Sequence, residues 1–256
     1  MIINFGDYWN EDIISRNKEK IIETTANIAQ QFKRAYRFFA AAKNIRDDME
    51  AIYENALDKG KYIYMVNRLK NEILGGVPYS QKITKPRHLF GSAFSPRGVI
   101  DHYETIIEPF NKVFYIKGSY IKGKSIIMER IMDEALYKGL FVEVYHEPME
   151  AHNIETLVIP ELKIVLTTSQ KFEKQNYKRL DLQEFLIQKK LDENEDKIRE
   201  DEILFERIIS AGFASINKAK REHDVLETYY VPSMKFNKID TLKKQLIEKI
   251  LSFDKK

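Results

Sequence analysis

Residues 112–125 read KVFYIKGSYIKGKS, an alternating apolar strand that leads into Gly118, Gly123, Lys124 and Ser125. The pattern G-x-x-x-x-G-K-[ST] follows this strand directly and precedes an amphipathic stretch, IIMERIMDEALYKG, which is the context of a phosphate-binding loop. In such a loop the backbone N–H groups and the N-terminus of the helix hold phosphate oxygens. The stretch therefore predicts an α/β fold with a phosphate site, against the alternative of a chance match in a glycine-containing turn.

We expect the whole loop to line the site, with Lys124 reaching the β- and γ-phosphates of ATP or GTP and Ser125 ligating Mg²⁺. Ile121 stands where many such loops carry a third glycine, and a β-branched residue disfavours positive φ. Nucleotide binding is therefore expected to be weak or altered. The eight expected binding residues are Gly118, Ser119, Tyr120, Ile121, Lys122, Gly123, Lys124 and Ser125.

Composition narrows the class of protein. The 256 residues include no cysteine, which excludes a disulfide framework, a thiol nucleophile and a Cys-based zinc site. The net charge of +3 arises from 42 basic and 39 acidic residues, a balance that does not indicate nucleic acid as a partner. No run of 18 apolar residues and no signal peptide is present, so we expect a cytoplasmic protein without a membrane partner.

A long helix, or a pair of helices, is predicted between Asp7 and Lys59, where neither Gly nor Pro occurs. Apolar residues recur there with alternating spacings of four and three, which is typical of a helix packed along its length against another helix. This set, called the seam below, is interrupted only by Arg46. Its members are Ile28, Phe32, Ala35, Phe39, Ala42, Arg46, Met49, Tyr53 and Ala56.

The seam recurs 177 positions later, from Phe205 to Ser233, with basic His223 in the place of Arg46. Without a gap, residues 17–74 and 194–251 share 13 identities in 58 positions, which indicates an internal duplication rather than two helices of similar composition. The two segments are therefore expected to follow the same helical path, with buried pairs such as Phe32 and Ile209, Ala42 and Ala219, and Met49 and Leu226. Because the phosphate loop precedes the second copy, its counterpart for the first copy would lie upstream of Met1.

These signals predict an α/β protein in which a small parallel P-loop sheet is flanked by two repeated long-helix units. The predicted parts are a helical unit at 1–75, a P-loop α/β domain at 76–172 and a second helical unit at 173–256. Before the loop we expect a strand in RHLFGSAF, a turn in SPRG and a helix in VIDHYETII. After it we expect a helix to Lys138 that stops at Gly139, strands at 140–145, 157–160 and 163–168, and helical structure from Phe172, interrupted at Pro232.

The catalytic signals are weaker than the binding signal. Glu147 follows the strand next after the loop and is our candidate for a catalytic carboxylate, although a solvated loop residue is the simpler interpretation. The cluster HEPMEAH at 146–152 has no recognised metal-ligand spacing. The best strand for a Mg²⁺-orienting aspartate ends instead in Thr167, Thr168 and Ser169, and Arg46 or His223 could act as an arginine finger or simply extend to solvent.

Together these residues resemble an uncharacterised family of bacterial P-loop ATPase-like proteins built from two tandem halves, each an α/β segment followed by a helical segment. The resemblance implies nucleotide binding but no particular substrate or pathway. Two departures stand out, since the family's first α/β segment is absent and its glycine-rich loop interior is replaced by 119–122. The resemblance covers nearly the full chain and depends on GDYW (6–9), FKRAYRFFAAAK (32–43), HLFGSAFSPRG (88–98), GSYIKGKS (118–125), VEVYH (142–146), VIPEL (158–162) and LETYYVPSM (226–234).

The expected function is binding of ATP or GTP with Mg²⁺, with hydrolysis slow or absent for want of a clear aspartate. The alternative is a degenerate P-loop protein that serves as a helical interaction or assembly scaffold without catalysis. A small-molecule kinase is disfavoured because no arginine-rich lid is evident. Expected partners are the nucleotide and, for the first helical unit, either another copy of the chain or an upstream P-loop half.

Overall fold

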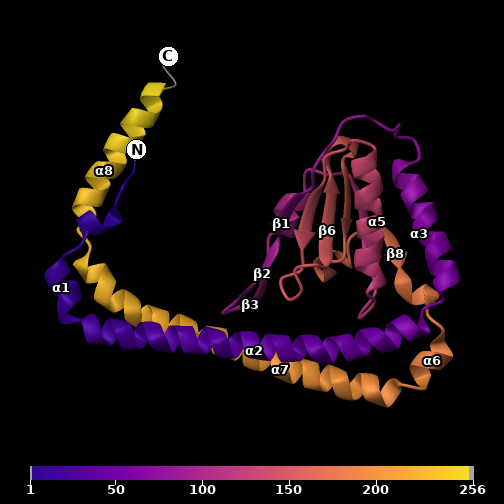
Figure 1. Ribbon diagram of the computed structural model, residues 1–256, viewed down its shortest axis with the longest axis horizontal. Coiled ribbons are helices and arrows are strands. Elements are labelled where there is room, and N and C mark those ends of the chain that lie inside the picture. The colour runs from indigo at the N-terminus through magenta and orange to yellow at the C-terminus, as the bar shows by residue number, and fades with distance from the viewer. Residues whose placement is uncertain (1, 254–256) are drawn as a thin grey trace. The chain divides into compact units, whose positions relative to one another are not determined.

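The computed structural model describes residues 2–253, with helices and strands arranged as in Figure 1. The α-helices are α1 (Glu11–Arg16), α2 (Lys18–Ala56), α3 (Lys59–Leu74), α4 (Tyr103–Ile107), α5 (Gly123–Tyr137), α6 (Gln188–Asp192), α7 (Glu195–Tyr230) and α8 (Phe236–Phe253). The 3₁₀ helices are η1 (Phe5–Tyr8), η2 (Pro160–Leu162), η3 (Gln170–Phe172), η4 (Leu182–Phe185) and η5 (Val231–Ser233). The strands are β1 (Arg87–Phe90), β2 (Ser92–Ser95), β3 (Gly98–Asp101), β4 (Lys112–Lys117), β5 (Glu143–His146), β6 (Ile154–Ile159), β7 (Ile164–Thr167) and β8 (Lys178–Asp181).

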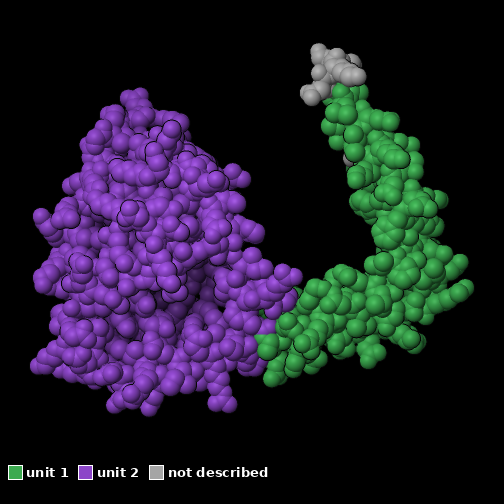
Figure 2. Space-filling view, turned by 180° about the vertical axis from the view of Figure 1, so that it is seen from behind, with its two compact units in different colours: residues 1–35, 214–256 green, residues 36–213 purple. Residues whose placement is uncertain are grey.

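The chain forms two compact units, coloured separately in Figure 2. Unit 1 combines residues 1–35 with 214–256, and unit 2 consists of residues 36–213. The long helices α2 and α7 contribute to both units and run side by side in opposite directions (Figure 1). All strands of the sheet belong to unit 2.

Six strands form a mixed sheet in the order β1-β5-β6-β7-β4-β8. Strand β4 pairs in parallel with β7 and β8, and β1 pairs in parallel with β5. The prediction of a parallel sheet is wrong for β6, which runs antiparallel to both β5 and β7. The cause is the connection between β6 and β7, a single 3₁₀ turn at Pro160–Leu162 followed by Lys163 with φ of 52°. Only antiparallel strands can be joined by so short a turn.

The two faces of the sheet enclose separate cores. In β4, Phe114 and Ile116 enter one core with α3 and α5, whereas Val113 and Tyr115 enter the other with α4. The alternation arises because successive side chains of a strand point to opposite faces of the sheet. Because both faces are covered, the central strands are apolar almost throughout, which made them visible in the sequence.

Two other local predictions need correction. The helix expected in VIDHYETII is confined to α4, because residues 98–101 form β3 and pair antiparallel with β2 around the turn at Pro96. The chain also does not become helical directly after Phe172, since β8 joins the sheet beside β4. β8 is an edge strand and carries the charged residues Lys178 and Arg179. These residues interrupt the apolar pattern by which the other strands were predicted, so the sequence did not indicate β8.

The helix ends of the phosphate-loop segment agree with the prediction. Helix α5 ends at Tyr137, and Gly139 adopts the positive φ of 74° that such a terminus requires. The helix after the predicted break at Pro232 is α8.

The internal repeat is visible in the local structure. The elements η1, α1, α2 and α3 correspond in order to η4, α6, α7 and α8, at positions offset by 177. Asn4 and Asp181 each cap a 3₁₀ helix by accepting from the N–H two residues ahead. Asn17 and Asn194 each donate from the side chain to the carbonyl four residues before. The helices of the two segments therefore occupy corresponding stretches of the chain, as the duplication predicts.

A pair of matching β-bridges connects the two repeats, with the roles exchanged. In unit 1 Trp9 forms a β-bridge with Met234, and in unit 2 Leu57 forms one with Leu186. Trp9 corresponds to Leu186 and Leu57 to Met234, so each unit contains the front of one repeat and the back of the other. The flanking backbone hydrogen bonds match as well: Asn10 N–H to Ser233 C=O, and Ile187 N–H to Ala56 C=O, each 2.8 Å.

Burial along the seam agrees with the prediction only in part. Ala42 and its counterpart Ala219 are both buried, but Phe32 is 39% exposed, so its predicted burial is wrong. Met49 is fully buried while Leu226 is half-buried. The difference follows the sheet, because Met49 lies in unit 2 and Leu226 lies in unit 1, whose described residues contain no sheet.

Across residues 2–253, none of the helices combines the length and the apolar character that crossing a lipid bilayer requires.

Candidate phosphate-binding site

Residues 118–125, the predicted phosphate loop, connect β4 to α5, with Gly123, Lys124 and Ser125 in the first turn of the helix. The backbone takes a positive φ at Tyr120, 51°, and not at Ile121. Ile121 is instead 3% exposed and packs in the core shared by α3 and α5. The expected strain at Ile121 is therefore absent, and the unusual backbone conformation falls one residue earlier.

Two N–H groups of the loop are used within it. Lys124 N–H donates to Ile121 C=O at 3.3 Å, and Ser125 N–H donates to Lys122 C=O at 3.1 Å. These bonds close the first turn of α5 and direct both groups toward the loop's own carbonyls. An anion would have to compete for them.

Both glycines of the motif also lie against neighbouring side chains. A Cβ at Gly123 would come within 3.0 Å of the Tyr62 ring, and the Tyr62 hydroxyl donates to Gly123 C=O at 2.8 Å. A Cβ at Gly118 would lie 3.1 Å from Ile121 and 3.2 Å from Leu182. Packing alone therefore accounts for glycine at both positions.

Lys124 is the motif residue that remains available for a ligand. Among the residues that the structure describes, its amine makes neither a hydrogen bond nor an ion pair. Burial lowers the pKa of this amine, and the nearby charges of Glu147 and Glu50 oppose that shift. A partly buried cation without a direct partner is costly unless an anion reaches it.

Ser125, the expected Mg²⁺ ligand, is held by protein groups. Its hydroxyl accepts from Ile154 N–H at 3.0 Å and donates to Glu129 at 3.2 Å. These bonds tie the start of α5 to the start of β6. The hydroxyl oxygen has a second lone pair, so a cation would share this oxygen with Ile154 N–H.

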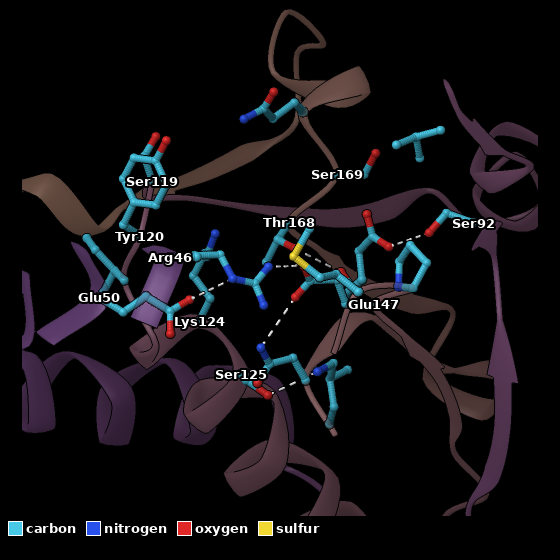
Figure 3. Close-up of a pocket in the computed structure, with 18 of the residues that line it drawn as sticks. Arg46, Glu50, Ser92, Ser119, Tyr120, Lys124, Ser125, Glu147, Thr168 and Ser169 are labelled. Atoms are coloured by element: carbon cyan, nitrogen blue, oxygen red, sulfur yellow. Dashed lines mark hydrogen bonds and ion pairs between the residues drawn. The ribbon is translucent and has the colours of Figure 1, made fainter. Parts of the chain in front are cut away.

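Arg46, which interrupts the seam, enters the site from α2. Its guanidinium pairs with Glu147, and its Nε lies 3.4 Å from Glu50 (Figure 3). The guanidinium also pairs with Glu150. The side chain is 11% exposed, so three carboxylates surround a largely buried cation. Arg46, which could act as an arginine finger, therefore lies beside the predicted phosphate loop.

The site is a pocket of about 530 Å³ that lies entirely within unit 2. Its walls come from α2, the hairpin of β2 and β3, the predicted phosphate loop, the β5–β6 connection, the end of β7 and the first half of α7. The charged residues that line it are Arg46, Glu50, Asp101, Lys122, Lys124, Glu147, Glu155, Lys171 and Glu206.

Glu147, the predicted catalytic carboxylate, does line this pocket. It is paired with Arg46 and accepts from the Asn153 side chain at 3.3 Å. Its side chain is 28% exposed, which leaves one face open to the cavity. Glu147 is therefore a partly exposed carboxylate held by an ion pair.

Sequence reasoning missed Glu155, a second carboxylate of the pocket. It lies on β6 and accepts from the Ser92 hydroxyl at 2.7 Å and from the Tyr103 hydroxyl at 2.9 Å. Burial raises the pKa of the Glu155 carboxyl, although these two donors oppose the shift. The antiparallel direction of β6 brings its first residues to the edge of the sheet where β4 and β7 end, and this could not be inferred from a parallel sheet.

The end of β7, next to β4, holds no carboxylate. Thr167 and Thr168 occupy the place where a Mg²⁺-orienting aspartate is expected, as the sequence indicated. Thr168 N–H donates to Glu155 C=O at 2.9 Å, so Glu155 is the acidic residue adjacent to this position.

The two histidines of the HEPMEAH cluster contact different partners. His146 contacts His88 at 2.7 Å between ring nitrogens, while His152 pairs with Glu150 at 2.9 Å. Glu150 is also bound by Lys43, at 3.3 Å, in addition to Arg46. The carboxylates of Asp47, Glu50 and Glu150 approach one another, but these cations already neutralise them.

No protein-family model, curated protein or solved structure matches this chain.

Proposed function

We propose that this chain binds a nucleoside triphosphate, ATP or GTP, together with Mg²⁺ at the phosphate loop. The observation that carries the proposal is the Lys124 amine, which faces a pocket of about 530 Å³ without a direct partner among the described residues. A phosphate there would pair with this amine and with the N-terminus of α5. The resemblance to the tandem P-loop ATPase-like family supports the same function.

Mg²⁺ is expected to be required for binding. Glu50, Glu147 and Glu155 line the pocket, and their carboxylates would repel a free triphosphate. A divalent cation supplies the compensating positive charge, and the Ser125 hydroxyl and the Glu155 carboxylate are oxygen ligands of the kind it prefers. These residues fit the cation, provided that Ser125 shares the oxygen now bonded to Ile154 N–H.

Arg46 and Glu147 link binding to catalysis in this proposal. A phosphate that attracts Arg46 would weaken the ion pair with Glu147 and leave that carboxylate free to orient or deprotonate a water molecule. Glu150 and Glu50 would hold the Arg46 side chain in place meanwhile. We expect slow hydrolysis, because the position after β7 carries threonine instead of aspartate.

The second candidate is a degenerate P-loop protein that acts as a helical interaction scaffold. It is favoured by the internal bonds of the Lys124 and Ser125 N–H groups and by the packing around Gly118 and Gly123. In this function the loop would be a structural turn, and the motif would persist for packing alone.

Calorimetric titration with ATP and GTP, with and without Mg²⁺, separates the two functions. Lys124→Ala should weaken binding at least ten-fold, about 1.4 kcal/mol, because it removes the cation that pairs with phosphate. Lys117→Ala is the matched control, since the Lys117 amine pairs with Glu173 and Asp181 outside the pocket. An absence of binding by the parent chain at millimolar nucleotide would reject the proposal in favour of the scaffold.

Phosphate release by the same proteins tests the catalytic assignment. We expect Glu147→Gln to abolish the slow release while nucleotide affinity changes little. Loss of release in Glu155→Gln alone would assign the catalytic carboxylate to Glu155 instead.

A further inference from the structure

Helix α8 carries a row of apolar side chains that the described structure leaves uncovered. Ile250 is 65% exposed and Leu251 is 56% exposed, and Leu246, one turn before Ile250, is half-buried. Large apolar residues in a continuous row on one helix face mark an interaction surface more often than isolated ones do.

The repeat identifies what such a face is used for. The counterpart of α8 is α3, and α3 closes the core of the α/β sheet against α5 (Figure 1). Leu69, Ile73 and Leu74 of α3 are 6%, 5% and 1% exposed and share that core with residues of α5 such as Met128 and Ile131.

Half of the six core-facing residues of α3 are retained in α8. Leu69, Ile73 and Leu74 correspond to Leu246, Ile250 and Leu251, so all three are identical in the two helices. The exposed face is not retained, because Ile63 and Tyr64 of α3 correspond to Asp240 and Thr241. The three apolar residues that α8 shares with α3 are therefore residues through which α3 packs against the α/β domain.

We propose that this face of α8 is the docking site for a second α/β domain of the same fold as residues 87–181, placed against α8 as the resident domain is placed against α3. A second copy of the present chain does not supply that domain, since the α/β domain of each copy already has α3 in its core. One position differs in kind: buried Val66 of α3 corresponds to Lys243. The second domain should therefore present a polar or acidic group there.

A fusion in which a second α/β domain replaces residues 1–4 tests the proposal. Residue 181 corresponds to residue 4, so residues 76–181 are joined directly before residue 5. The readout is hydrogen–deuterium exchange in residues 236–253, whose sequence occurs once in the fusion. We expect exchange in α8 to slow at least ten-fold relative to the unmodified chain, because docking covers a helix that is otherwise exposed.

Two substitutions in the fusion make the result specific. Leu246→Asp should restore fast exchange in α8, whereas Lys244→Asp, at an exposed position that corresponds to exposed Asn67, should not. Unchanged exchange in α8 of the fusion would overturn the proposal, whether or not the added domain folds, because α8 is proposed to complete its core.

Light scattering on the unmodified chain tests the rival occupant. A dimer that Leu246→Asp dissociates, with α8 already protected from exchange in that dimer, would show that a second copy covers the face and would also overturn the proposal. For the unmodified chain we expect neither a dimer that Leu246→Asp dissociates nor protection of α8 from exchange by dimer formation.

Discussion

Substitution of Gly212 by alanine should destabilise the chain, although alanine is the better helix former. Gly212 of α7 lies against Phe39 of α2, and a Cβ there would be 2.5 Å from Cε1 and 2.8 Å from Cδ1 of the Phe39 ring. The ring is 7% exposed and packs on Phe94 and Phe213, with centroid distances of 4.6 and 5.4 Å. It cannot move away without displacing two other aromatic rings.

Two effects of the Gly212→Ala substitution oppose each other. Alanine inside a helix is favoured over glycine by about 1 kcal/mol. Overpacking of a filled contact costs roughly 1 to 3 kcal/mol, and both distances to Phe39 are shorter than real Cβ contacts allow. We expect the steric term to win and the free energy of unfolding to fall by about 1 kcal/mol net.

Urea denaturation measures this difference, and Gly60→Ala in α3 is the control. A Cβ at Gly60 would have Asp58 Oδ1 as its nearest neighbour at 3.5 Å, an ordinary contact, so this change should stabilise by up to about 1 kcal/mol. Phe39→Leu combined with Gly212→Ala should cost less than the two single changes added together. A Gly212→Ala variant that is as stabilised as Gly60→Ala would refute the close packing of α2 and α7 at this point.

Two further predictions concern the sheet. Thr156 and Thr167 are fully buried and share a hydrogen bond of 2.8 Å, and the Thr167 hydroxyl also accepts from Ser169 N–H. Thr156→Val should cost about 1 kcal/mol and Thr167→Val more, because the second change removes both bonds; equal urea midpoints would contradict this. Burial raises the pKa of the Glu155 carboxyl in the folded chain above its value in the unfolded chain. Between these two pKa values the folded chain binds more protons than the unfolded chain, so this contribution to stability declines as pH rises through that window. Glu155→Gln should therefore gain stability relative to the parent from pH 4 to pH 7, and a difference that does not vary with pH would exclude the shift.

Local patterns in the sequence were sufficient for the elements whose signals lie within a few residues. Alternation in KVFYI predicted β4, and the glycine and lysine pattern after it located the loop and the start of α5. The offset of 177 predicted two long helices of equal register, and the caps at Asn17 and Asn194 agree with it. These features are encoded by spacing along the chain, which a helix or a strand converts directly into a face.

Only the tertiary structure decided which groups share the pocket. Arg46 and Glu147 are about 100 positions apart, and Glu155 enters beside them because a short turn reverses β6 within the sheet. Ile73 and Leu74 of α3 recur in α8 as Ile250 and Leu251, yet the first pair is buried and the second is exposed, because α3 packs in the core of the α/β sheet. Burial and ion pairing depend on contacts between distant segments, and these contacts leave no periodic trace in the sequence.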